Sequence, residues 1–216
     1  MAAFQAALFD MDGLLFDSER IGIIEMIAAA KEQGIDLAEE PVRSTIGMTI
    51  EAAKKVYMAW APDLDYDALR ISFTNRMHHL AAAGQMPLKK GVHELLETMK
   101  ALAMPMAVAS SSGEDTIRVY LDKAGILSYF SVLVSGVDMP HSKPAPDIFL
   151  AAAEKLGVKA EHCLVLEDSY YGVKAGRAAG CTVCMVPDVL PYLDELKPFV
   201  DHVLPSLTHI IPLLEA

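Results

Sequence analysis

FQAALFDMDG, residues 4–13, is a short apolar run that ends in two aspartates. The run from Phe4 to Phe9 is long enough for a buried strand, which would deliver Asp10 and Asp12 to its C-terminal tip. Open α/β sheets place their chemistry at that edge. An aspartate at the first position can attack phosphorus, and one two residues later can protonate the leaving oxygen and then activate water. The stretch therefore predicts an enzyme built on a parallel sheet.

Two other interpretations of Asp-x-Asp-Gly compete with this one. A calcium loop begins in the same way, but its ligands continue through a run of polar residues. Here Leu14, Leu15 and Phe16 follow, and apolar side chains cannot ligate a hard cation. The other interpretation is that Asp10 and Asp12 merely begin a turn after the strand. The motif alone leaves that interpretation open, and three later segments weigh against it.

Composition limits the class of protein. The chain has 216 residues, 53% of them hydrophobic, which is enough for one substantial core, or for a core and a small accessory domain. Its 29 acidic and 18 basic residues give a formal charge of −11, which disfavours nucleic acid and anionic membrane surfaces as partners. We find no secretory signal and no 18-residue uncharged apolar segment, so we expect a cytoplasmic protein without a membrane span.

The pair Cys181 and Cys184 has the Cys-x-x-Cys spacing of a redox site or of half a zinc site. The other half of a zinc site is missing, because Cys163 has no second ligand pair at usable spacing. The segment also resembles a buried strand, in which residues three apart face opposite sides of the sheet. We therefore favour core packing for these cysteines.

The chain divides into a helical part and an alternating part. Residues from Ser18 to about Gln85 carry helical periodicity and no convincing strand, whereas helices and strands alternate from Gly91 onward. We expect later strands at Met104–Ser110, Ser131–Ser135, His162–Glu167 and Cys181–Val186. The pattern predicts an α/β fold: a doubly wound, Rossmann-like parallel sheet in residues 1–16 and 89–216, with a small inserted helical cap domain in residues 17–88.

Polar residues follow three of the later strands. Ser110, Ser111 and Ser112 precede the start of a helix, where hydroxyls and free N–H groups bind anions, although an ordinary N-cap needs only one serine. Lys143 lies in a proline-rich loop, where a fixed ammonium can hold phosphoryl oxygens; a solvated surface lysine is the alternative. Glu167 and Asp168 bring carboxylates to the same edge as Asp10 and Asp12, and magnesium suits such an all-oxygen cluster.

These motifs resemble the haloacid dehalogenase-like phosphohydrolases in their order and in their positions at strand ends. The matching residues are Asp10-Met11-Asp12-Gly13, Ser110, Lys143 with the following Pro144-Ala145-Pro146-Asp147, and Glu167-Asp168. The helical insert resembles the cap of the β-phosphoglucomutase-like subgroup. The resemblance implies that Asp10 forms an aspartyl-phosphate and that Asp12 is the acid and base. It also implies that Asp10, the backbone carbonyl of Asp12, and Asp168 hold Mg²⁺, with Glu167 behind them, and that Ser110, Ser111 and Lys143 bind the phosphoryl group.

The cap residues separate a phosphatase from a mutase. Mutases of the subgroup carry a histidine and an arginine that grip the distal end of a sugar phosphate, and these positions fall on Gly22 and near Ile50. Neither residue can make that contact. Four other residues are candidates for cap contacts to the substrate, each with surface or packing roles as the alternative: Arg20, Met48, Thr49 and Arg76.

We therefore expect a magnesium-dependent phosphatase that hydrolyses a small phosphate monoester, a sugar phosphate or a nucleotide-like monophosphate. A β-phosphoglucomutase-like mutase is the alternative, followed by a binding module that has lost catalysis, although both Asp10 and Asp12 are present. The expected assembly is a monomer or a weak homodimer.

Overall fold

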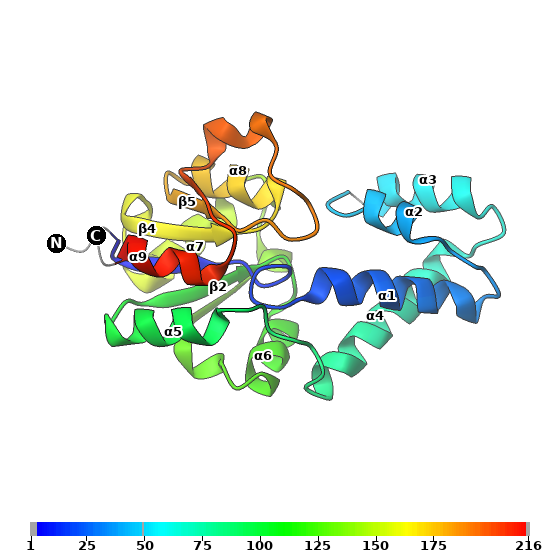
Figure 1. Ribbon diagram of the computed structural model, residues 1–216, viewed down its shortest axis with the longest axis horizontal. Helices are drawn as coiled ribbons and strands as arrows, with labels where there is room; N and C mark the ends of the chain where they lie inside the picture. The colour runs from blue at the N-terminus through cyan, green and yellow to red at the C-terminus, as the bar shows by residue number, and fades with distance from the viewer. Residues whose placement is uncertain (1–3, 49, 215–216) are drawn as a thin grey trace.

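The computed structural model describes residues 4–48 and 50–214, and a parallel sheet forms the centre of this part of the chain (Figure 1). The order of its six strands is β3-β2-β1-β4-β5-β6. The strands are β1 (Ala6–Phe9), β2 (Met106–Ser110), β3 (Val132–Ser135), β4 (Cys163–Glu167), β5 (Thr182–Met185) and β6 (His202–Val203). After β1 the chain adds β2 and then β3 on one side of β1, and it then adds β4, β5 and β6 on the other side. The sheet therefore has its topological switch point between β1 and β4, where α/β proteins bind ligands.

Helices cover both faces of the sheet, which confirms the predicted doubly wound α/β fold. Successive residues of a strand face opposite sides. The helices of this part are α5 (Val92–Ala101), α6 (Glu114–Lys123), α7 (Asp147–Leu156), α8 (Tyr170–Ala178) and α9 (Ile211–Leu214), and short 3₁₀ turns lie at Leu127–Tyr129, Gly136–Asp138, Ala160–His162, Asp194–Phe199 and Leu207–Ile210. In β1, Ala7 and Phe9 join the apolar cluster beneath α5 and α6, whereas Ala6 and Leu8 join the cluster beneath α7 and α8.

A separate group of helices extends from one end of the sheet (Figure 1). It consists of α1 (Ser18–Glu32), α2 (Glu39–Ser44), α3 (Ile50–Trp60) and α4 (Tyr66–Ala82), and it encloses an apolar cluster of its own around Tyr57 and Leu69. Its two connections to the sheet run side by side, because Phe16 and Leu88 form an antiparallel bridge. We keep the division at residues 16/17 and 88/89 as a proposal.

Some short elements escaped prediction. The sheet has a further edge strand, β6, of only two residues, which is too short to show a period of two. It is held in place by Asp201, whose backbone N–H donates to Val183 O and whose carboxylate accepts from Val183 N–H.

The three cysteines are buried and free, and burial raises the pKa of each thiol. None of the helices in the described residues is long and apolar enough to cross a membrane.

Candidate active site

Asp10 and Asp12 lie at the tip of β1, where the chain makes a tight turn into the cap. Gly13 occupies the left-handed region at φ +80°, and a Cβ built on it would lie 2.2 Å from Asp168 Oδ2. Its backbone N–H donates to Phe16 O at 3.0 Å and to Ser18 Oγ at 3.2 Å. Glycine is therefore required both by the backbone and by the close approach of Asp168.

Lys143 joins the ends of three strands. Its Nζ donates to Asp10 Oδ1 at 2.5 Å, to Glu167 Oε1 at 2.7 Å and to the carbonyl of Ala109 at 3.2 Å. The side chain is only 8% exposed, and its ammonium lies 5.0 Å from the centre of the Phe149 ring. The loop lysine predicted from sequence is thus a buried cation beside Asp10.

Glu167 uses both of its carboxylate oxygens within the protein. Oε1 accepts from Lys143, and Oε2 accepts from the backbone N–H of Asp168 at 3.1 Å, the N–H of Ser169 at 3.0 Å and its hydroxyl at 2.9 Å. A Cβ on Gly172 would lie 1.7 Å from Oε1, so the first turn of α8 must carry glycine there to make room for the carboxylate. Glu167 is therefore well placed to orient Lys143.

The serine loop after β2 contacts Asp12. Ser112 Oγ donates to Asp12 Oδ2 at 3.3 Å and Ser110 Oγ at 3.5 Å, while the N–H of Ser112 donates to Ser110 Oγ at 3.1 Å. Ser111 is exposed and lines the pocket in front of Asp12. Ser110 and Ser111 are the serines that the sequence predicts to bind phosphate, but Ser112 makes a shorter contact to Asp12 than Ser110 does, because the chain bends back after the strand tip.

Four carboxylates and one ammonium share this buried region. Burial raises the pKa of Asp10 to about 8, against the opposing effect of Lys143, and nearby Glu167 and Asp12 raise it further. Burial also raises the pKa of Asp12, and burial with the charges of Glu167 and Asp10 raises that of Asp168 well above its usual value. For Lys143, burial lowers the pKa, but Asp10 and Glu167 outweigh it and raise it above its usual value. The four carboxylates therefore have only one positively charged group, Lys143, to offset them.

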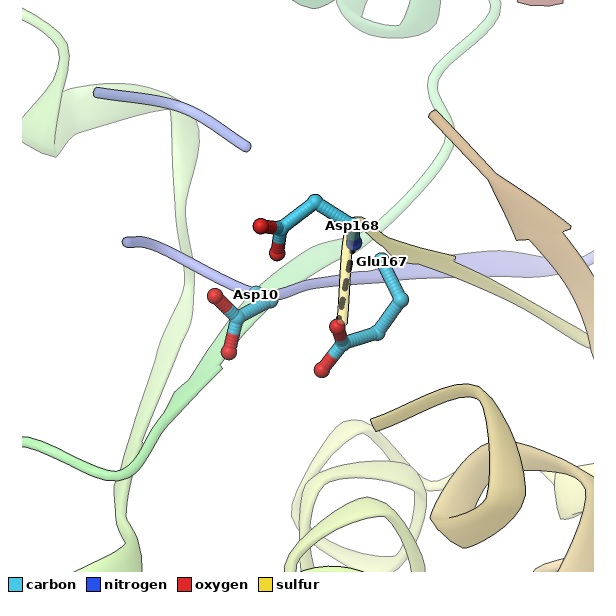
Figure 2. A group of neighbouring side chains, drawn as sticks. All are labelled: Asp10, Glu167 and Asp168. Carbon is cyan, nitrogen blue, oxygen red and sulfur yellow. Dashed lines mark hydrogen bonds between the residues drawn. The ribbon is translucent and has the colours of Figure 1, made fainter. Parts of the chain in front are cut away.

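Asp10, Glu167 and Asp168 form an acidic cluster that suits a divalent cation. Figure 2 shows Asp10 at the end of β1 beside the other two at the end of β4, and one oxygen of each lies within 4.8 Å of the others. Asp168 Oδ1 is buried and has no hydrogen-bond partner among the described residues. An orphaned buried oxygen beside a surplus of carboxylates fits the all-oxygen coordination of Mg²⁺.

A pocket of about 600 Å³ opens between the sheet edge and the cap. The core contributes Asp12, Ser111 and Ser112, together with residues of α6. The cap contributes one face each of α1 and α4 and parts of α2 and α3, including Glu19, Gly22, Met26, Thr45, Tyr57, Arg70, Phe73, Thr74, Met77 and His78. The pocket is of the size that holds a small metabolite.

The cap candidates from sequence lie elsewhere. Arg20 pairs with Asp17 and Asp188. Arg76 lies in an outer groove between α1 and α4, where it pairs with Glu25 and Glu32, and neither arginine lines the pocket. Met48 is 46% exposed and also does not line it. Thr49 lies outside the described residues.

Three further charged or titratable residues line the pocket and are not among the candidates predicted from the sequence: Glu19, Arg70 and His78. Arg70 and His78 lie two turns apart on α4, a spacing that places them on one helix face, and that spacing is the signal that was available. Packing between the cap and the sheet decides which face of a cap helix turns toward the core. Helical periodicity alone does not predict that face.

The sequence profile of the haloacid dehalogenase-like hydrolases matches residues 7–186. A Drosophila melanogaster protein named "Probable pseudouridine-5'-phosphatase" is 33% identical over 84% of this chain and 80% of its own. A phosphorylated carbohydrates phosphatase of Thermotoga maritima is 30% identical over 82% of each chain. The crystal structure of a hydrolase from Deinococcus radiodurans, solved with bound phosphate and sodium, superposes with a TM-score of 0.80 at 28% identity over 99% of each chain.

Proposed function

Because the chain belongs to the haloacid dehalogenase-like hydrolases and is a phosphatase of that family, we propose that it hydrolyses a small phosphate monoester through a phosphorylated Asp10. The observation that carries this proposal is the group of Asp10, Asp12, Lys143 and Asp168 at the switch point of the sheet. It supplies a nucleophile, an acid and base, a cation and a metal site in one place. The relatives named as phosphatases of phosphorylated carbohydrates and of pseudouridine 5'-phosphate support a sugar phosphate or a nucleotide-like substrate.

In the proposed first step, a carboxylate oxygen of Asp10 attacks phosphorus and the bond to the leaving oxygen breaks. The ammonium of Lys143 lies beside Asp10 and neutralises negative charge on the phosphoryl oxygens during transfer. The hydroxyls of Ser110 and Ser111 donate to those same oxygens. Asp12 carries a proton to the leaving oxygen, and its raised pKa favours the protonated form that this step needs.

In the second step, Asp12 accepts a proton from a water molecule whose oxygen attacks phosphorus, and the bond between phosphorus and the Asp10 oxygen breaks. Phosphate leaves, and Asp10 returns to its carboxylate form. The hydroxyl of Ser112 holds the Asp12 carboxylate in position for both proton transfers. The whole cycle therefore uses one acid and base in alternating protonation states.

We propose Mg²⁺ as the cofactor, held by Asp10, the backbone carbonyl of Asp12, and Asp168. When bound, the ion offsets negative charge on the carboxylates and the phosphoryl group. Glu167 stays outside this set, because its two oxygens already accept hydrogen bonds from Lys143, Ser169 and the backbone.

Water as the final acceptor is favoured by the cap. A mutase must hold the distal end of a sugar phosphate while it transfers the phosphoryl group a second time. Gly22 lines the pocket but has no side chain to donate a hydrogen bond, and Ile50 is apolar, 50% exposed and not among the lining residues. We therefore prefer a phosphatase to a mutase.

A substrate panel tests this proposal. Phosphate release from sugar phosphates, nucleoside monophosphates and small acid phosphates is measured with Mg²⁺ or with EDTA. We expect release that requires Mg²⁺. Conversion of β-glucose 1-phosphate to the 6-phosphate without phosphate release would instead make the protein a mutase.

A further inference from the structure

The six arginines of the chain differ in their partners. Five form ion pairs with carboxylates: Arg20 with Asp17 and Asp188, Arg43 with Glu39, Arg76 with Glu25 and Glu32, Arg118 with Glu114, and Arg177 with Asp201. Arg70 makes no ion pair and no side-chain hydrogen bond within residues 4–48 and 50–214, although it is half-buried. A guanidinium carries five N–H donors, and no protein acceptor in these residues uses those of Arg70. They are therefore available to a ligand in the pocket that Arg70 lines.

Arg70 lies on the face of α4 that lines the pocket. Arg70, Phe73, Thr74, Met77 and His78 all line it, and their spacing of three and four residues places them on one helix face. His78 lies at the end of α4 that meets Thr116 and Tyr120 of α6, because these residues line a common apolar pocket. Arg70 lies eight residues earlier, about 12 Å along the helix axis. It is therefore at the outer end of the pocket, remote from the sheet.

The charges of the pocket are arranged along this direction. Asp12 and Glu19 line the inner end, and burial raises the pKa of Glu19 to about 7, with further contributions from the charges of Asp12 and Asp188. The scissile phosphoryl group belongs at this inner end, because Asp12 is next to the buried Asp10–Lys143 pair in the proposed reaction. At the outer end, Arg70 contributes a fixed positive charge that no protein carboxylate neutralises within the described residues.

We propose that Arg70 selects, among small phosphate monoesters, those that carry a second anionic group at the end remote from the scissile phosphoryl group. The planar guanidinium binds a carboxylate or a phosphate through two parallel hydrogen bonds. This inference rests on the proposed phosphatase function and adds the class of leaving group to it. Because the second anion lies remote from Asp10, it contributes to binding and positioning and leaves the chemistry at Asp10 unchanged.

The test compares substrates that differ only in the second anion. The pairs are fructose 1,6-bisphosphate against fructose 1-phosphate, and 4-phosphoerythronate against erythritol 4-phosphate. Phosphate release with Mg²⁺ gives kcat/KM for the wild type, Arg70→Gln and Arg70→Lys. Arg43→Gln is the matched control, since it removes the same charge from an exposed cap residue that pairs with Glu39. Thermal melting of each variant checks that it is folded.

We expect the wild type to prefer at least one anionic member about 10- to 100-fold, the range of a charged hydrogen-bonded contact. Arg70→Gln should lower kcat/KM for the anionic member about 10- to 100-fold more than for the neutral member, so that the preference disappears. Arg70→Lys should retain part of the preference and Arg43→Gln all of it. A preference for the bisphosphate or for the carboxylate identifies the second group. Equal rates for both members of each pair in the wild type, or an equal loss on both members in Arg70→Gln, would overturn the inference while leaving the phosphatase intact. No phosphate release from any compound would contradict the proposed function itself.

Discussion

Lys143 connects the ends of three strands through its hydrogen bonds to Asp10, Ala109 and Glu167. It neutralises part of the charge of Asp10 and Glu167, and both carboxylates are buried, so removal of the ammonium leaves two buried carboxylates without a cationic partner. The serine contacts, by comparison, are long and involve a neutral donor. Lys143 should therefore affect both stability and catalysis.

We predict that Lys143→Gln lowers kcat by about 10²- to 10³-fold, the usual effect of removing one donor to developing charge. The melting temperature should fall as well, because a buried ion pair loses one partner. Steady-state phosphate release and thermal melting measure the two effects. The exposed Lys123→Gln is the control and should match the wild type in both. Wild-type kcat in Lys143→Gln would contradict the role given to the ammonium.

Gly172 is a second residue whose substitution should change both stability and kcat. A methyl group there would occupy the space of the Glu167 carboxylate, at 1.7 Å from Oε1. Gly172→Ala should therefore destabilise the protein by about 1–3 kcal/mol, as overpacking does, and lower kcat by displacing the partner of Lys143. Urea unfolding measures the first effect. Gly113→Ala is the control, because its φ is −67° and its Cβ would meet nothing within 4 Å. Equal stability of the two variants would show that the carboxylate has room to move.

Asp10 should make the stability of the metal-free protein depend on pH. Its pKa is about 8 in the folded state against a usual value of 3.8, so between these values the folded state binds more protons than the unfolded state. Stability in EDTA should therefore fall as the pH rises from about 4 to 8. Melting temperatures across this range measure the slope. Added Mg²⁺ should reduce it, and so should Asp10→Asn; a rising stability in EDTA, or a slope unchanged in Asp10→Asn, would contradict this assignment.

At the scale of the elements, the two connections between the sheet and the cap both form ion pairs with a third segment, the loop after β5. Asp188 follows β5, its side chain is 1% exposed, and its Oδ1 accepts from Arg20 of α1 at 2.7 Å and from Lys89 of the return connection. Both connections are thus tied to one core loop, which also approaches the cap at Leu190, 3.9 Å from a Cβ built on Gly47. The loop helps to set the angle of the cap.

We predict that Asp188→Asn destabilises the protein by about 1–3 kcal/mol, because a buried acceptor of two cations loses its charge. It should also raise KM, since the cap supplies most of the pocket. Urea unfolding and substrate titration measure these changes. Asp63→Asn, at an exposed position in the cap, should stay within about 0.5 kcal/mol of the wild type. If Asp188→Asn did the same, the ion pairs would have no role in placing the cap.

The elements also show why sequence reasoning reached the sheet and missed parts of the pocket. Apolar runs ended by Asp10, Ser110 and Glu167 reveal strands and their tips, because strand burial is a local pattern. Ser112 and Arg70 depend instead on how a loop bends and on which helix face turns inward. Such features are set by contacts between distant segments, so they appear only in the assembled structure.

For the whole molecule, function depends on two parts meeting at one edge. The sheet brings together the groups proposed for phosphoryl transfer. The helices α1–α4 extend from one end of the sheet (Figure 1), and they supply most of the residues that line the pocket. With a formal charge of −11, the protein repels anions at a distance. The local cations Lys143 and Arg70, with the proposed Mg²⁺, must therefore provide the attraction for a phosphate ester.

The most direct test of the central claim is to trap the phosphorylated Asp10. Asp12→Ala lacks the base that activates water, and acetyl phosphate with Mg²⁺ is a donor whose leaving group needs no acid. Intact-mass measurement followed by peptide mapping should find one added phosphoryl group on Asp10 in Asp12→Ala and none in the Asp10→Asn/Asp12→Ala double variant. Phosphate on another residue, or full phosphate release by Asp10→Asn with no phosphorylated protein in Asp12→Ala, would contradict the account.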